Sequence, residues 1–173
     1  QDEIVPAQNL GGRTTFQNAG RTHRHGLELS ADAEFGPVTL TGAATFIEAR
    51  FRDGYSKCAA PPCANPADVV PAGRRIPGIA RQQLYAQLDW RLAWAQGAVL
   101  GLEARHTGRV PVNDANSDFA GAATVLALSL RHDITRGAWR LQPFLRIDNL
   151  TNRRYAVSVI VNEGNGRFFE PAA

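Results

Sequence analysis

Cys58 and Cys63 have the most specific redox chemistry in this 173-residue chain, and they enclose the sequence Ala-Ala-Pro-Pro. Two thiols at this spacing form a local disulfide bond under oxidising conditions, or they supply half of a zinc site. A complete zinc site needs further ligands, and no histidine lies near this pair in the sequence. We therefore predict a disulfide that braces a loop, and no metal site.

Two histidines, His23 and His25, lie beside Arg21 and Arg24. Alternate residues of a β-strand share one face, so the two imidazoles could bind haem iron or copper together. A solvated basic surface is the interpretation that the sequence favours over metal binding. The cluster is expected to lead into the first long strand.

A polar segment contains Arg109, Asn113, Asp114 and Asn116. Guanidinium, amide and carboxylate groups of this kind suit a surface that contacts a ligand. Turn chemistry explains the Asn and Asp residues equally well, because their side chains bond to nearby backbone groups. These four residues are candidate ligand-binding residues.

Three arginines, Arg153, Arg154 and Arg167, lie near the end of the chain. Together with a net charge of +3 and a pI near 9.3, they could attract an anionic chelate. Arginine also binds lipid phosphates, and this alternative has equal weight. We include the three arginines among the candidate ligand-binding residues.

The motifs of common enzymes are absent from the sequence. It has no Gly-x-Ser-x-Gly elbow, no phosphate-binding Walker loop and no His-Glu-x-x-His. Ser129 and His132 would lie on opposite faces of a strand. The arginines are spread over alternate strand positions rather than gathered into one stripe, which argues against nucleic-acid binding. We predict that the chain is not an enzyme, uses no cofactor and binds no nucleic acid.

The elements that must position these residues are long β-strands, because apolar and polar residues alternate with period two. The alternating runs pair into three hairpins with short turns, which gives about six strands. The paired segments are residues 27–35 with 38–46, 84–94 with 98–105, and 126–133 with 139–148. Pro143 makes the pairing of the last strand less certain, since proline donates no ladder hydrogen bond.

The lengths of these runs favour a membrane barrel. A tilted membrane strand needs roughly 9 to 11 residues, whereas a soluble strand has about 5 or 6. Short turns alternate with long connections at residues 50–80, 106–121 and beyond 149, as in outer-membrane barrels. Trp90, Trp94 and Trp139 lie near the short-turn ends, where we expect an aromatic girdle. A soluble sandwich or a lipocalin-like barrel is the alternative that alternation alone leaves open.

Composition predicts a piece of a longer exported protein. The sequence contains no Met, opens with no signal peptide and has no apolar run of about 18 residues. A mean hydropathy of −0.25 is compatible with a membrane barrel, because the apolar and polar residues that alternate along each strand offset one another in the mean.

The stretch from Phe144 to Pro171 resembles the closing signature of the TonB-dependent outer-membrane receptors. The matching residues are Asn149, Leu150, Asn152, Arg154, Tyr155, Gly166, Phe169 and Pro171. Shorter marks of the same family occur earlier and in the same order, at Asn18, Gly20, Gly26, Glu28, Arg75, Ile76, Pro77, Gly78, Val110, Asn113, Asp114 and Asn116. The resemblance covers nearly the whole chain.

This resemblance implies an all-β fold: part of an antiparallel, up-and-down transmembrane β-barrel. Residues 1–173 would be the C-terminal portion of the barrel, without the plug domain and the last strand. The six clear strands would be the sixteenth to twenty-first of 22, and residues 2–5 the tail of the preceding strand. The cell location that the resemblance implies is the outer membrane of a Gram-negative bacterium.

The function that the resemblance implies is TonB-dependent uptake of a scarce ligand. A ferric siderophore is expected because it is the commonest ligand class; pyrroloquinoline quinone, copper, haem and cobalamin are the alternatives within the family. Expected partners are outer-membrane lipid, lipopolysaccharide, and TonB through an N-terminal part that this sequence lacks. Lipopolysaccharide also becomes a candidate contact for the basic cluster at residues 21–25. A small stand-alone ligand-binding β-barrel is the alternative of a different class.

Overall fold

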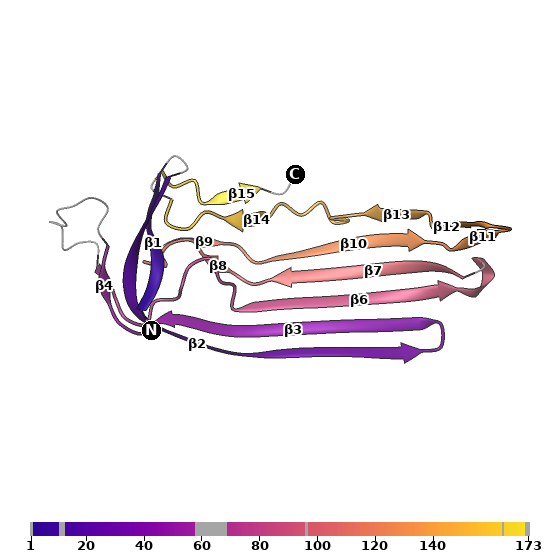
Figure 1. Ribbon diagram of the computed structural model, residues 1–173, viewed down its shortest axis with the longest axis horizontal. Helices are drawn as coiled ribbons and strands as arrows, with labels where there is room; N and C mark the ends of the chain where they lie inside the picture. The colour runs from indigo at the N-terminus through magenta and orange to yellow at the C-terminus, as the bar shows by residue number, and fades with distance from the viewer. Residues whose placement is uncertain (1, 11–12, 58–68, 96, 164, 172–173) are drawn as a thin grey trace.

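The computed structural model describes residues 2–10, 13–57, 69–95, 97–163 and 165–171. Its main feature is a single layer of seven antiparallel strands that run up and down, each beside its neighbours in the chain (Figure 1). The order is β1 (Asp2–Leu10), β2 (Arg13–Phe35), β3 (Val38–Phe51), β6 (Gln82–Leu92), β7 (Ala98–Thr107), β10 (Ala123–Arg131) and β13 (Phe144–Ile147). The all-β, antiparallel, up-and-down barrel fold predicted from the sequence is confirmed.

The register of the sheet confirms the predicted alternation. Leu40 of β3 lies opposite Ala33 of β2 and Leu88 of β6, while the adjacent Thr41 lies opposite Asp32 and Gln87. Because successive side chains of a strand point to opposite faces, the sheet has two chemically distinct surfaces. The apolar face comprises Leu27, Leu29, Ala31, Ala33, Phe35, Val38, Leu40, Gly42, Ala44, Phe46, Leu84, Ala86, Leu88, Trp90, Leu100, Leu102, Ala104, Leu126, Leu128, Leu130, Leu145 and Ile147. The polar face comprises Glu28, Asp32, Glu34, Thr39, Thr41, Gln83, Tyr85, Gln87, Asp89, Glu103, Arg105, Ser129, Arg131 and Arg146.

Short turns join the strands at one end of the sheet. Gly36, Gly97 and Gly137 have φ values of 58°, 82° and 56° in these turns, a backbone conformation that glycine adopts without steric cost. Gln96, which precedes Gly97, lies outside the described residues. Trp94 and Trp139 are largely exposed at this end, 80% and 74%, as the sequence predicts.

Four boundaries differ from the sequence prediction. β2 begins at Arg13 rather than at residue 27, so the basic cluster at residues 21–25 lies within a strand, and β1 extends to Leu10. β6 ends at Leu92, and Trp94 lies in the short 3-10 turn η2 (Ala93–Ala95). The segment predicted as one strand over residues 139–148 is divided at Pro143 into β12 (Trp139–Leu141) and β13. β12 pairs with β11 (Ile134–Arg136) instead of the main sheet, because proline lacks the N–H that the ladder requires.

The long connections lie at the other end, where they form three short ribbons. These pair β4 (Tyr55–Ser56) with β5 (Val69–Val70), β8 (Val110–Pro111) with β9 (Phe119–Ala120), and β14 (Ala156–Val159) with β15 (Phe169–Pro171). We call residues 49–57, 69–81, 108–121 and 149–163 together the loop platform.

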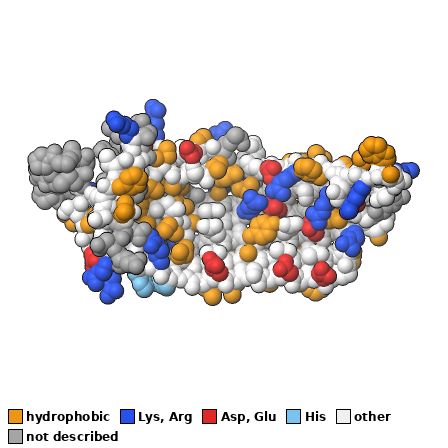
Figure 2. Space-filling model, in the orientation of Figure 1, with side chains coloured by type: hydrophobic (Ala, Val, Ile, Leu, Met, Phe, Trp, Pro, Cys, Tyr) orange, Lys and Arg blue, Asp and Glu red, His pale blue; other side chains and the backbone are white. Residues whose placement is uncertain are grey.

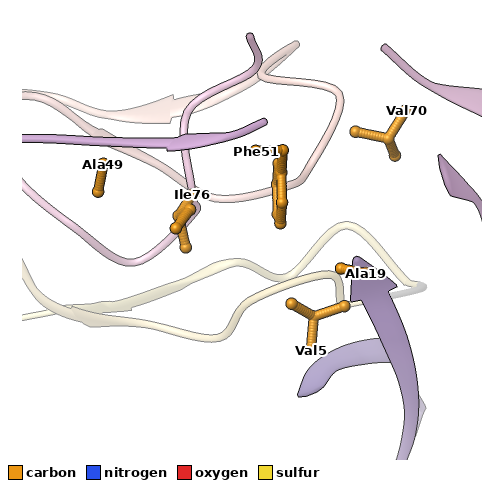
Figure 3. Close-up of a cluster of buried hydrophobic side chains, with 6 residues drawn as sticks. All are labelled: Val5, Ala19, Ala49, Phe51, Val70 and Ile76. Carbon is orange, nitrogen blue, oxygen red and sulfur yellow. The ribbon is translucent and has the colours of Figure 1, made fainter. Parts of the chain in front are cut away.

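The loop platform packs against β1 and β2 around a hydrophobic core. Figure 3 shows the core residues Val5, Ala19, Ala49, Phe51, Val70 and Ile76, which come from β1, β2, β3 and the β3–β6 connection. Phe51 is fully buried, and its ring meets the ring of Tyr55 edge to face at 5.1 Å. The strands thus carry the platform at their ends, where a candidate ligand site was predicted. No helix among the described residues has the length and apolar character needed to cross a membrane.

Candidate functional site

The polar face carries ion pairs that reach across an intervening strand. Arg146 of β13 contacts Glu103 of β7 at 3.1 Å, over the small side chains of Ala127 and Ser129 on β10. Figure 2 shows acidic and basic side chains interleaved along the strands. The charges on β7, β10 and β13, together with Asp89 of β6, are therefore paired within the sheet, whereas among the described residues no ion pair is seen for Glu28, Asp32 or Glu34 of β2.

A second pair of the same kind depends on a glycine. Arg131 of β10 donates to Asp89 of β6 at 2.9 Å, across β7. A Cβ at Gly101 of β7 would lie 2.8 Å from the Asp89 carboxylate and 2.5 Å from the Ser129 hydroxyl oxygen. Gly101 therefore leaves the room that these polar side chains occupy.

A cavity of about 630 Å³ lies between the polar face and the returning segment at residues 155–159. Its charged lining is Glu103, Arg105, Arg146 and Asp148, and alanine and valine side chains supply most of the rest. The volume lies within the range of small-molecule sites, roughly 300 to 1,000 Å³. A small ligand with both apolar surface and charge would suit this chemistry.

Three connections of the loop platform meet at a buried polar network. The Lys57 ammonium lies 3.0 Å from the Asp114 carboxylate and donates to the Asn162 amide oxygen at 2.8 Å. The Asn162 amide donates to Asp114 at 2.8 Å, and the backbone N–H of Asp114 donates back to Asn162 at 3.1 Å. Asp114 is fully buried. This network, which we call the loop latch, joins segments far apart in the chain.

Tyr55 lies beside the loop latch. Burial, with a smaller effect from the Asp114 carboxylate, raises the pKa of its phenol far above the ordinary range. The phenol therefore stays neutral and adds no charge to the buried site. The candidate residue Asp114 accordingly faces the interior of the platform.

Asn116 and Asn113, two more of the candidate ligand residues, fix the same connection. The Asn116 side chain accepts from the Arg75 backbone N–H at 2.8 Å and donates to the Arg75 carbonyl at 2.9 Å. Asn116 has φ 52°, in the left-handed region that Asn tolerates better than most residues. Asn113 accepts from the Ser117 backbone N–H at 3.0 Å. The turn chemistry that the sequence left open is present, and ligand contact by these residues stays a prediction.

The remaining candidate residues lie apart from this network. Arg109 places its guanidinium 4.3 Å from the centroid of the Phe119 ring, on the side of the apolar face. Arg153, Arg154 and Arg167 are exposed, and the Arg153 backbone is held by Asn149 at 2.8 Å. Cys58 and Cys63 lie outside the described residues. The structure thus brings together Asn113, Asp114 and Asn116, while the Arg109 side chain packs on Phe119 and has no part in their hydrogen bonds.

His23 and His25 lie on one face of β2, as alternation requires, with ring centroids 4.9 Å apart. His25 lies opposite Glu48 of β3. Within the part of the chain that the structure describes, no three His, Cys, Asp or Glu side chains are grouped so as to hold a metal ion.

Several residues of the site were missed at the sequence level. Lys57 and Asn162 of the loop latch were missed because 105 positions separate them and neither belongs to a periodic pattern. The pairing of Glu103 with Arg146 was also missed. The only signal for that pair was its parity, because both residues occupy polar positions of period-two strands, and β10 separates the two strands.

Comparisons with known proteins agree with this architecture. The family described as "TonB dependent receptor-like, beta-barrel" matches residues 1–150. Two solved structures of similar fold are the siderophore receptor PiuA and BauA, the ferric preacinetobactin receptor, both from Acinetobacter baumannii. PiuA has a TM-score of 0.73 at 16% identity, over 92% of this chain and 21% of PiuA. BauA has a TM-score of 0.69 at 18% identity, over 94% of this chain and 23% of BauA. The chain spans less than a quarter of the length of either receptor.

Proposed function

Because this chain belongs to the TonB-dependent receptor β-barrel family, we propose that it forms the C-terminal portion of a barrel that imports a ferric siderophore across a Gram-negative outer membrane. In this proposal the plug domain and the TonB contact belong to an N-terminal part of the receptor. The chain acts in transport and catalyses no reaction.

The two chemically distinct faces of the sheet carry this proposal. The apolar face suits the hydrocarbon of a bilayer, and the ion-paired polar face suits a water-filled lumen. Strands β1 and β13 form the two edges of the sheet, and unpaired backbone groups at such edges are costly in lipid. Further strands of a larger barrel would satisfy them, which favours a receptor barrel over a small stand-alone barrel.

The ligand assignment rests on chemistry at the platform end of the polar face. The cavity there combines apolar side chains with Arg105 and Arg146, whose guanidiniums pair with Glu103 and Asp148. Arg153, Arg154 and Arg167 are exposed at the same end, and these three supply the guanidiniums for an anionic ligand. Guanidinium groups bind carboxylate and catecholate oxygens well, and these are the groups with which many iron chelators hold Fe³⁺. PiuA and BauA, which share the fold, are siderophore receptors by their descriptions, and this supports the same ligand class here.

Iron uptake tests the proposal directly. The complete coding region around this segment is expressed in a Gram-negative strain without its own siderophore receptors, and uptake of ⁵⁵Fe-siderophores is measured with and without functional TonB. We expect saturable uptake that requires TonB, reduced in the triple variant R153A/R154A/R167A. R13A/R136A/R140A, which removes the same charge elsewhere, serves as the control.

Other outcomes identify the alternatives. TonB-dependent uptake of haem, cobalamin, copper or pyrroloquinoline quinone, without iron-siderophore uptake, would reject the siderophore and keep the transporter. Ligand binding that requires neither TonB nor a plug would support the small stand-alone barrel.

A further inference from the structure

The cavity between the polar face and residues 155–159 has an apolar floor on β10. The polar-face positions of this strand are Ala123, Val125 and Ala127 along the cavity, and they become polar at Ser129, beyond it. Apolar side chains on a face that meets water gain free energy when a bound molecule covers them. The floor therefore favours a ligand group with apolar surface.

The charged groups of the cavity are already paired with one another. The Arg105 guanidinium lies 2.7 Å from the Glu103 carboxylate. The Arg146 guanidinium lies 3.1 Å from Glu103 and 2.8 Å from the Asp148 carboxylate. Two guanidiniums thus face two carboxylates, and the four groups carry no net charge. A charged ligand group would lose its water and compete with these partners, whereas an uncharged group avoids both costs.

The hydrogen-bonding groups that remain free in the cavity lining are uncharged. Asn149 and Ser158 already bond to other residues. Within the described ranges, the side chains of Gln83, Thr107 and Tyr155 have no hydrogen-bond partner. Their amide, hydroxyl and phenol groups can donate to and accept from a ligand. An amide or hydroxyl of the ligand would satisfy them without introducing a charge.

Both ends of residues 155–159 are held, so the cavity exists before a ligand binds. On one side, Asn149 accepts from the Arg153 backbone N–H at 2.8 Å and donates to the Arg153 carbonyl at 3.0 Å. On the other side, Asn162 belongs to the loop latch. A ligand that enters a preformed site has a smaller ordering cost to overcome.

Basic side chains lie next to the cavity. Arg153 and Arg154 are exposed and directly precede Tyr155, which lines the cavity. We propose that the cavity is a subsite for an uncharged part of the ligand, an amide- or hydroxyl-bearing group on an apolar carbon frame, while the anionic part stays outside at the two arginines. The inference rests on the proposed function and names a second determinant of which ligand is recognised.

The binding of two small probes of similar shape tests the subsite. N-benzoylglycinamide carries an apolar ring and two uncharged amides, whereas N-benzoylglycine has a carboxylate in place of one amide. Each probe is titrated into the complete receptor, purified in mild detergent, and binding is followed by ligand-detected NMR. We expect the amide to bind with a dissociation constant on the order of 1 mM, and at least about tenfold more tightly than the carboxylate.

Two variants and their matched controls locate the binding. Ala123→Phe fills the floor of the cavity, and Thr107→Val removes a free hydroxyl at nearly constant volume. We expect A123F to abolish binding of the amide and T107V to weaken it about fivefold. Ala43→Phe and Thr39→Val make the same changes on the polar face outside the cavity, and both should bind the amide as the wild type does. Unchanged heat-modifiable migration on gels verifies that each variant is folded.

Several outcomes would overturn the subsite. These are no binding of the amide, equal or tighter binding of the carboxylate, wild-type affinity in A123F, or equal losses in the control variants.

Uptake of ⁵⁵Fe-siderophores by the same receptor separates this inference from the proposed function. Amide binding in the cavity of a receptor that takes up no iron counts against the siderophore function alone. TonB-dependent iron uptake without amide binding counts against the subsite alone.

Discussion

The seven strands of the main sheet, which we call the strand wall, and the loop platform use apolar side chains in opposite ways. In the wall, Leu27, Leu29 and Leu102 are 55%, 55% and 44% exposed on the apolar face. In the platform, Phe51 and Val112 are fully buried. The apolar side chains of the strand wall therefore need an apolar solvent around them, whereas those of the loop platform are buried against one another.

Charged side chains are also more exposed in the strand wall than in the loop platform. Arg131 and Arg146 of the wall reach carboxylates across a wide polar face, and Arg131 is 53% exposed. In the platform, the Asp114 side chain of the loop latch is 1% exposed. Loss of a partner should therefore be costly in the platform and tolerable in the wall.

The largest expected effect comes from breaking the loop latch. Asp114→Ala leaves the Lys57 ammonium partly buried without its counter-ion, which should destabilise the platform by about 3 to 4 kcal/mol. Hydrogen exchange of the complete receptor should accelerate at residues 110–118 and stay slow in β6 and β7. Asp118→Ala, an exposed carboxylate of the same connection, is the control. Equal exchange in both variants would contradict the buried-pair interpretation.

The next effect compares the two faces of the wall at adjacent alanines. Ala44 lies opposite Leu84 on the apolar face, whereas Ala43 lies opposite Tyr85 on the polar face. Ala44→Arg should destabilise the folded barrel in lipid by about 2 kcal/mol, and Ala43→Arg by less than about 1 kcal/mol. Urea titration of refolding into phospholipid vesicles measures both. Equal costs would mean that the faces are assigned wrongly.

A smaller effect is expected at the hydrogen bonds that join two platform connections. Asn116→Ala removes the side-chain bonds to both backbone groups of Arg75 and places alanine at φ 52°, which should cost about 1 to 2 kcal/mol locally. Asn116→Asp keeps the acceptor and loses the donor, so its cost should be intermediate. Protease susceptibility of residues 72–78 reports the change, and a wild-type rate in Asn116→Ala would refute it.

The smallest effect concerns an exposed ion pair between β2 and the platform. The Arg21 side chain donates to the Asp53 carboxylate at 2.8 Å, and the Arg21 backbone N–H donates to it as well. These hydrogen bonds lower the pKa of the Asp53 carboxyl. A carboxyl with a lowered folded-state pKa stabilises the fold fully above about pH 4, and this contribution disappears as pH falls through the folded-state pKa. The protection factor of the Arg52 amide, which bonds to the Arg21 carbonyl, should therefore fall in acid in the wild type but not in Asp53→Asn.

The wall was predictable from sequence because its determinants are local. Period-two alternation marked the strands, and Gly36, Gly97 and Gly137 marked the turns, so strand order followed directly. The start of β2 was missed because His23, Arg24 and His25 interrupt the apolar alternation. The division at Pro143 was only partly anticipated, since sequence gave no second partner for residues 139–141.

The platform was not predictable, because its determinants are distant in sequence. Asn113, Asp114 and Asn116 were chosen as polar loop residues, but nothing local indicates that Asp114 is buried against Lys57. The grouping of Arg81 and Arg109 on the apolar-face side was equally hidden, since the two residues come from different connections and share no motif. Such clusters depend on the register of the strands that carry them.

The separations along the chain also imply an order of assembly. Each wall hairpin joins segments a few residues apart, so its loop-closure cost is low, whereas the contact between Lys57 and Asn162 closes 105 residues. The strands between them must already be in register for these two residues to meet. The loop latch should therefore form last, and protease resistance of the loops during refolding should lag behind heat-modifiable migration. Formation of the loop latch would then report that all the strand pairs from β3 to β13 have formed in the correct register.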